Sequence, residues 1–349
     1  NLYVGNVNSL APSRIITYPG QNSVNVTNDM ILQGGADDYV VALIQTDSGD
    51  FYVSANDLTL NGGGPVAPPP PGKKLATAEI RSRSGDGTIS AFRDLILNGA
   101  TIDAGNSLCY AQISSYQGSV NFSNIGRDLQ LNGGNGVLCY AQIGSGYLKP
   151  FPPPNPAPAA PSDINSNISI DLIGRDLTIR GSTAVTGQQA YVQIGHSPFW
   201  NDATITTTIP VTGDVIISSV LNEIALHGGA AQSTTAVIGH GNDFTKDLSK
   251  CSGNIDVTCN GPNGIVLIPG APALDTHTTI GFHSPHDKVA DNNTFRVSSD
   301  LVSVKSLLGP IVINYQPPPP LPAPASYGDR TNATIGYYNA TTKTNAVPK

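Results

Sequence analysis

The sequence predicts an all-β protein: a single-stranded parallel β-helix, or solenoid, of about eight three-strand coils. Three observations support this fold class. A short strand with the pattern Ala-x-Gln-Ile-Gly returns along the chain, a second alternating strand that ends at glycine returns with it, and proline-rich segments interrupt the spacing. A strand that recurs with sequence identity at near-regular spacing is typical of a solenoid, in which each coil stacks on its neighbour.

The first repeated element is clearest at residues 139–144, which read CYAQIG. The isoleucine of this element is expected to form one buried row through the core, and the glutamine before it an amide ladder along the axis. The expected glutamine ladder contains Gln112, Gln142 and Gln193. The expected isoleucine row contains Ile44, Ile80, Ile113, Ile143, Ile194, Ile238, Ile280 and Ile335.

The second element begins with an acidic residue and alternates apolar and polar positions, as at residues 57–62, which read DLTLNG. Period-two alternation is typical of a strand with one buried face. A third alternating strand, often opened by Gly-Asp, completes each turn, as at residues 213–217. Three short strands cannot enclose a core alone, so we expect each to pair in parallel with its copy about 4.8 Å away.

The same pattern sets the predicted domain organisation. Residues 24–338 form the β-helix, residues 1–23 a lead-in or subunit-contact segment, and residues 339–349 a C-terminal tail. Proline cannot donate a hydrogen bond within a central sheet, so the proline-rich segments are expected to leave the helix as exposed loops. Loop insertions are predicted near residues 65–74, 149–161, 197–212, 242–251, 285–295 and 316–330. Two stacked β-sandwiches are the alternative, but they do not explain the recurring sequence identity.

Composition excludes some functions. The net charge is −7 and only 12% of residues are charged, which argues against nucleic acid as a partner. No apolar run approaches the roughly 18–20 residues that cross a bilayer, so we predict no membrane span. The chain begins at Asn1 without methionine, and we expect a processed protein or a segment of a longer one.

Four cysteines are candidates for disulfides. Cys109 and Cys139 hold equivalent places one coil apart, where stacked strands bring Cα atoms within bridging distance. Cys251 and Cys259 flank a short strand and could close a small loop. The alternative for the first pair is a row of small apolar side chains. No CxxC spacing occurs, which argues against a zinc cluster or a thioredoxin-like site.

A row of acidic residues opens the second strand of successive coils. Its members include Asp57, Asp94, Asp128 and Asp176. An arginine directly precedes each of the last three, at Arg93, Arg127 and Arg175. Calcium binding and paired carboxylates for glycoside cleavage are the functional interpretations. We favour turn capping, in which an aspartate accepts backbone N–H bonds, because an element that appears in six coils is expected to serve the coil rather than one active site.

Histidines supply the remaining candidates for chemistry. His196 and His240 each follow an Ile-Gly pair one coil apart, and we expect them at exposed corners rather than in a metal site. We therefore predict no catalytic, cofactor or metal-binding residue, and no enzyme activity.

The three repeated elements resemble the repeats of bacterial surface and secreted β-solenoids, namely filamentous-haemagglutinin-like and autotransporter-passenger-like adhesins and fibre subunits. The resemblance spans roughly residues 24–335. It implies a right-handed helix and a secreted, extracellular or cell-surface location.

The end of the repeat array favours one function within that class. Only residues 336–349 follow the last repeat, and they show no amphipathic helix that would cap an open sheet edge. We expect a structural subunit that binds copies of itself head to tail to form a fibre or filament. The alternatives are a monomeric adhesin that binds host or matrix glycans through its loops and, less favoured, a polysaccharide-cleaving β-helix enzyme.

Overall fold

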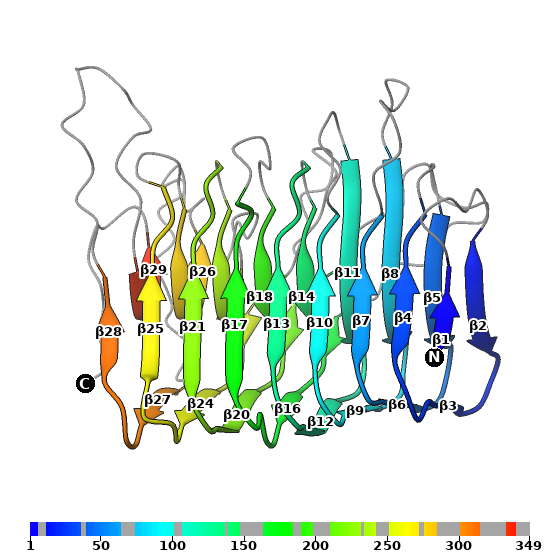
Figure 1. Cartoon of the computed structure of the whole chain (residues 1–349), viewed down its shortest axis with the longest axis horizontal. Coiled ribbons are helices and arrows are strands. Elements are labelled where there is room, and N and C mark those ends of the chain that lie inside the picture. The colour runs from blue at the N-terminus through cyan, green and yellow to red at the C-terminus, as the bar shows by residue number, and fades with distance from the viewer. Residues whose placement is uncertain are drawn as a thin grey trace.

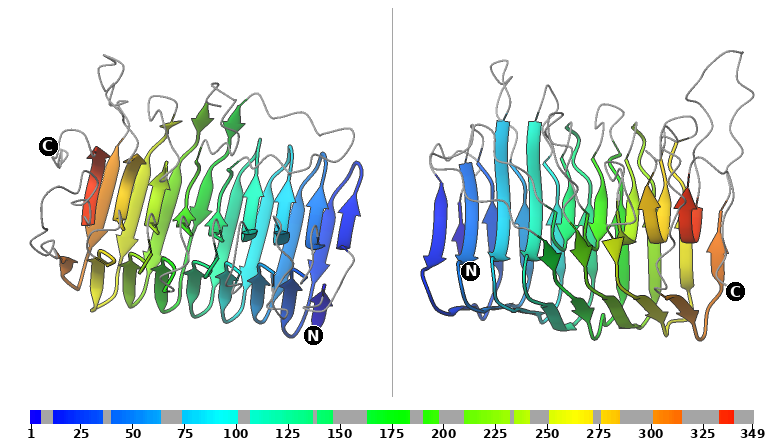
Figure 2. Two further views of the ribbon diagram at one scale, coloured as in Figure 1. Left: turned by 90° about the horizontal axis from the view of Figure 1, so that it is seen from above. Right: turned by 180° about the vertical axis from the view of Figure 1, so that it is seen from behind.

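The computed structural model confirms the predicted parallel β-helix. It describes residues 1–5, 12–35, 40–63, 74–100, 107–136, 139–146, 163–183, 190–197, 210–231, 234–241, 251–271, 276–284, 301–314 and 333–339. These residues form four sheets and no helix, so the described part of the chain contains no helical segment that could cross a membrane. The strands stack along a straight rod, with the first strands at one end and the last at the other (Figures 1 and 2).

Three long sheets, here called A, B and C, form the walls of the rod, and every strand pair in them is parallel. Sheet A contains β1 (Leu2–Val4), β4 (Met30–Gln33), β7 (Leu58–Asn61), β10 (Leu95–Asn98), β13 (Leu129–Asn132), β17 (Asp176–Arg180), β21 (Glu223–His227), β25 (Gly264–Ile268) and β28 (Ile311–Ile313). These are the strands of the predicted second element. Sheet B contains β2 (Ser13–Thr17), β5 (Val40–Thr46), β8 (Lys74–Ser82), β11 (Ser107–Ser115), β14 (Ala141–Ile143), β18 (Val192–Ile194), β22 (Ala236–His240), β26 (Thr278–Ser284) and β29 (Ala333–Asn339).

Sheet C carries the third element. It contains β3 (Asn22–Asn25), β6 (Phe51–Ala55), β9 (Gly87–Ala91), β12 (Val120–Ile125), β16 (Ile168–Ile170), β20 (Val215–Val220), β24 (Ile255–Cys259) and β27 (Val302–Ser306). The chain passes from A to B to C in each coil, so equivalent residues lie side by side in successive strands. Leu95, for example, pairs with Leu58 on one side and Leu129 on the other.

The core is a set of aliphatic rows inside this tube. Alternate residues of each strand point inward, as the period-two pattern predicts. The isoleucine row of sheet B is fully buried from Ile44 to Ile280 and pairs residue for residue along its length. Burial of such rows is the main favourable term in the stability of the rod.

The first coil begins earlier than the sequence pattern indicates. Residues 1–23, predicted as a lead-in, contain β1 and β2, which pair with β4 and β5 in register. The strand Ser13–Thr17 lacks the Gln-Gly signature and was therefore not identified, although its Ile15 pairs with Ile44. As a result sheet B has nine strands where eight were predicted.

A fourth, short sheet also departs from the predicted three-strand coil. It joins β15 (Ile164–Asn165), β19 (Val211–Thr212) and β23 (Cys251–Ser252) at the corner between sheets B and C. Strand β19, the first residue of β23 and the first residue of β8 fall inside predicted loop insertions. The remainder of the six predicted loops lies outside the described residues, apart from Ser197 and Pro210.

Candidate functional site

The glutamines of the repeated strand form a continuous ladder on sheet B. The Nε2 group of Gln112 donates to Oε1 of Gln142 at 3.1 Å, and Gln142 donates to Oε1 of Gln193 at 3.3 Å. Each amide also donates to the carbonyl of a glycine in the next coil, Gly144 at 3.0 Å and Gly195 at 3.1 Å. All three glutamines are buried, so these bonds satisfy groups that would otherwise be costly to bury.

The glycine of the repeated strand has a positive φ, and the carbonyl of the glycine in the following coil lies close to it. The values are +125° at Gly144, +147° at Gly195 and +131° at Gly239. A Cβ on Gly195 would lie 1.7 Å from the carbonyl oxygen of Gly239. Only glycine combines this backbone conformation with this close approach. The Gln-Ile-Gly pattern therefore encodes the corner of the coil.

The acidic row is held by the arginines of the following coil. Arg127 donates through Nε (2.8 Å) and Nη2 to the carboxylate of Asp94, and Arg175 donates in the same way to Asp128, with Nε at 2.7 Å. Each carboxylate also accepts the backbone N–H of the next acid in the row, 3.2 Å from Asp128 to Asp94 and 3.4 Å from Asp176 to Asp128. The row therefore caps the turns that lead into sheet A.

The pKa of Asp94 reflects this arrangement. Partial burial acts to raise it, but the hydrogen bonds from Arg127 and from the N–H of Asp128 outweigh burial, and the pKa lies below its ordinary value. Arg93 pairs with Asp57 at 3.0 Å one coil earlier. An ionised carboxylate that is engaged by an arginine and a backbone N–H suits turn capping better than general acid catalysis.

A second capping row lies where the chain enters sheet C. Asp50 accepts the N–H of Asp86 at 2.9 Å, Asp86 accepts that of Ser119 at 2.7 Å, and Asn167 accepts that of Asp214 at 2.8 Å. These are the Gly-Asp positions of the third repeated element. Sequence reasoning treated them as strand openings and missed their capping role.

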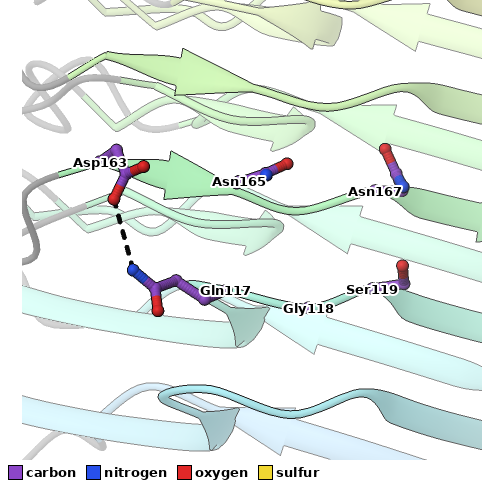
Figure 3. A pocket seen from close by; sticks show the side chains of 6 residues that line it. All are labelled: Gln117, Gly118, Ser119, Asp163, Asn165 and Asn167. Carbon is purple, nitrogen blue, oxygen red and sulfur yellow. Dashed lines mark hydrogen bonds between the residues drawn. The ribbon is translucent and has the colours of Figure 1, made fainter.

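A shallow polar groove of about 400 Å³ opens in this second row. Ser119 is the shorter side chain in a row of aspartate and asparagine, and the space beside it is lined by Gln117, Gly118, Asp163, Asn165 and Asn167 (Figure 3). Nε2 of Gln117 donates to Oδ1 of Asp163 at 3.3 Å. The groove offers amide and carboxylate groups for hydrogen bonding, and Asp163 is the one titratable residue among its described lining residues.

Neither predicted disulfide is present. Cys109 and Cys139 are buried thiols that pack with Ala76 and Ala100. They do lie next to each other in successive coils. A side-chain hydrogen bond with Cys109 is the main cause that raises the pKa of Cys139, and burial raises it further.

Cys251 and Cys259 belong to the main core and are also thiols. Cys251 pairs with Val211 in the short fourth sheet, while the Cys259 thiol donates to the carbonyl of Gly264 at 3.2 Å. The predicted loop closure assumed that the two cysteines flank one strand. The structure instead places Cys251 in β23 and Cys259 in β24, and these two strands belong to different sheets.

The histidines predicted at exposed corners are buried. His196 and His240 are 0% exposed and stack with ring centroids 5.5 Å apart, and His240 contacts Phe282 at the same distance. Nδ1 of His196 accepts the N–H of Ser145 at 2.9 Å. Burial, and secondarily the neighbouring His240, lower the pKa of His196 to about 3. Both histidines are therefore structural members of a ring stack.

A tyrosine stack is the feature that sequence reasoning missed most completely. Tyr110, Tyr140 and Tyr191 are buried and stack with ring centroids 4.6 Å apart at interplanar angles of 7° and 9°. The hydroxyl of Tyr110 donates to the buried carboxylate of Glu79 at 2.9 Å, and Arg81 pairs with Glu79 at 2.7 Å. The signal was present as the tyrosine two residues before each glutamine of the ladder.

The two ends of the rod differ from its middle. Seven apolar residues pack on the core but remain partly exposed, and all lie in or next to the first or last strand of a sheet: Leu2, Ile15, Val24, Val26, Val304, Ala333 and Ile335. Among the residues that the structure describes, five of the ten large exposed apolar side chains lie within 13 residues near the C-terminal end: Leu301, Leu307, Leu308, Ile311 and Ile313. Ile311 and Ile313 belong to β28, the last strand of sheet A.

These end coils, with their partly exposed apolar side chains, are the candidate functional site. The described residues contain no group of three or more His, Cys, Asp or Glu side chains that could hold a metal ion. The end coils instead offer edge strands and aliphatic side chains, which can bind another protein by strand addition and burial of apolar surface. Comparisons of this chain with protein-family models, with curated proteins and with solved structures found no match.

Proposed function

We propose that this chain is an extracellular structural protein, a β-solenoid subunit that assembles end to end with copies of itself into a surface fibre or filament. The observation that carries the proposal is the difference in burial along the isoleucine row of sheet B. Its members from Ile44 to Ile280 are fully buried between neighbouring coils, whereas its ends, Ile15 and Ile335, remain partly exposed. A second copy at either end would bury them as the interior coils bury theirs.

Two further features support a structural role. The polar ladders of glutamine and aspartate stabilise the stacking of coils and leave their carboxylates and amides engaged with one another. The extracellular location rests on the resemblance of the repeats to those of secreted β-solenoids. A non-enzymatic function fits both the polar ladders and this location.

Replacing Ile313 by lysine is expected to abolish assembly without unfolding the subunit. Ile313 is 47% exposed at the C-terminal end, so lysine costs the isolated subunit little, but at a junction it would bury an unpaired charge. The control is Leu221→Lys, because Leu221 is equally exposed (46%) and follows β20 in the middle of the rod. Sedimentation velocity over a range of concentrations should show large species for the unchanged protein and for Leu221→Lys, and monomers for Ile313→Lys. Assembly of all three proteins to the same extent would contradict the proposal.

The polar groove supports a second candidate, a monomeric adhesin that binds glycans. Its amide and carboxylate groups at Gln117, Asp163, Asn165 and Asn167 are suited to sugar hydroxyls. Glycan binding that is lost in Asn165→Ala, by a protein that stays monomeric at all concentrations, would favour this candidate over the fibre.

A further inference from the structure

We propose a specific register for the junction between subunits: β1 of one copy adds to β28 of the next, and β2 adds to β29, in parallel and in the register that the interior coils use. This inference rests on the proposed function and specifies its interface. The occupant of each open end is a second copy of this chain, so the contact is head to tail and repeats without closing.

The apolar rows of the two ends match in this register. In sheet A, one interior row runs from Leu2 through Met30 to Ile265 and Ile311, and its neighbour runs from Val4 through Leu32 to Leu267 and Ile313. The next member of these rows would be Leu2 above Ile311 and Val4 above Ile313. In sheet B, Ile15 of the second copy would follow Ile335.

The backbone groups also match. In sheet A the N–H at one fixed position of each strand donates to a carbonyl of the following strand: Leu2 to Asp29 at 2.9 Å and Ile265 to Pro310 at 2.9 Å. By the same alternation the N–H of Ile311 faces the open end, and its acceptor would be the carbonyl of Asn1 in the next copy.

Sheet B follows the same rule, since Ala236 donates to the carbonyl of His277 at 2.9 Å. The equivalent donor in the last strand of the sheet is Ala333, and the equivalent acceptor in the first is the carbonyl of Pro12. Proline can serve here because this position contributes a carbonyl to the junction.

The proposed register does not extend to sheet C. It has eight strands where sheets A and B have nine. Continuation of sheets A and B therefore leaves one strand position of sheet C between β27 of one copy and β3 of the next. The proposed register concerns sheets A and B alone.

A disulfide across the junction tests the register. Tyr3 and Val312 occupy the same outward row of sheet A, through Ile31 and Val266, and Tyr3 is 62% exposed. In-register parallel strands bring Cα atoms to about 4.8 Å, within disulfide range. The double variant Tyr3→Cys/Val312→Cys, oxidised with diamide, should give a ladder of covalent multimers on a non-reducing gel that collapses to one band on reduction.

Three controls give each outcome a meaning. The unchanged protein should stay monomeric on the gel because its four cysteines are buried. Tyr3→Cys/Asn314→Cys, displaced by two residues along the strand, should cross-link at least tenfold less. Val312→Cys alone should not cross-link, and a covalent dimer from it would show that C-terminal ends meet each other, which overturns the proposal. Filaments in electron micrographs without the Tyr3–Val312 ladder would overturn the register and leave the proposed function standing. Absence of both filaments and ladder would overturn both.

Discussion

Replacement of Gly195 by alanine is expected to destabilise the protein by more than about 4 kcal/mol, a loss large enough to prevent folding of many proteins. Two effects combine at this residue. Its φ of +147° is strained for any residue with a side chain, and the added Cβ would lie 1.7 Å from the carbonyl oxygen of Gly239. That carbonyl accepts the hydrogen bond of Gln193 at 2.8 Å, so relief of the clash would break the glutamine ladder.

Gly20→Ala is the matched control for this prediction. Gly20 also has a positive φ, +135°, but the nearest atom to an added Cβ is 3.5 Å away on Thr17. It should lose only the backbone contribution, about 1–2 kcal/mol. Urea unfolding followed by circular dichroism measures both variants against the unchanged protein. Equal losses for the two variants would show that stacking of the glycine corners does not limit stability.

Acidification is expected to remove the stabilising contribution of neutral His196. The pKa of this residue is about 3 in the folded protein, because of burial and of His240, against an ordinary value of 6.5. As the pH falls below about 6.5 the unfolded chain binds a proton that the folded chain does not, so stability falls by about 1.4 kcal/mol per pH unit. The loss is complete only as the pH approaches the folded pKa of about 3.

His196→Phe isolates this contribution from that of the carboxylates. The variant keeps the ring stack with His240 but loses the acceptor for the N–H of Ser145, which should cost about 1–3 kcal/mol at pH 7. Between pH 6 and pH 4 the stability of the variant should fall less steeply than that of the unchanged protein, by about 1.4 kcal/mol per pH unit. Unfolding curves at several pH values measure the two slopes, and equal slopes would contradict the assignment of a buried neutral histidine.

Periodicity could predict the architecture because equivalent side chains pack in the same way in successive coils. The isoleucine and leucine positions follow from alternation, and the sequence identity of the AQIG strand fixes which strands share a sheet. The first coil escaped detection because its strand in sheet B reads Ser-Arg-Ile-Ile-Thr. It keeps the apolar position of Ile15 but not the glutamine and glycine that mark the interior copies.

The environment of outward side chains could not be predicted in the same way. Alternation places Tyr140 opposite the core row, and His196 follows the glycine of a corner; both positions suggest exposure, yet both side chains are buried. The cysteines illustrate the related limit. Strand stacking correctly places Cys109 beside Cys139, but proximity does not decide between a bridge and two thiols. Exposure at the two ends depends on which coil is last, and a repeat pattern alone does not reveal it.

The central claim is that the end coils join subunits by continuing sheets A and B from one copy to the next, and electron microscopy of the purified protein tests it most directly. Nine strands per subunit in sheets A and B, spaced about 4.8 Å apart, predict unbranched filaments of constant width with an axial repeat of about 43 Å. Isolated short rods at every protein concentration would contradict the claim.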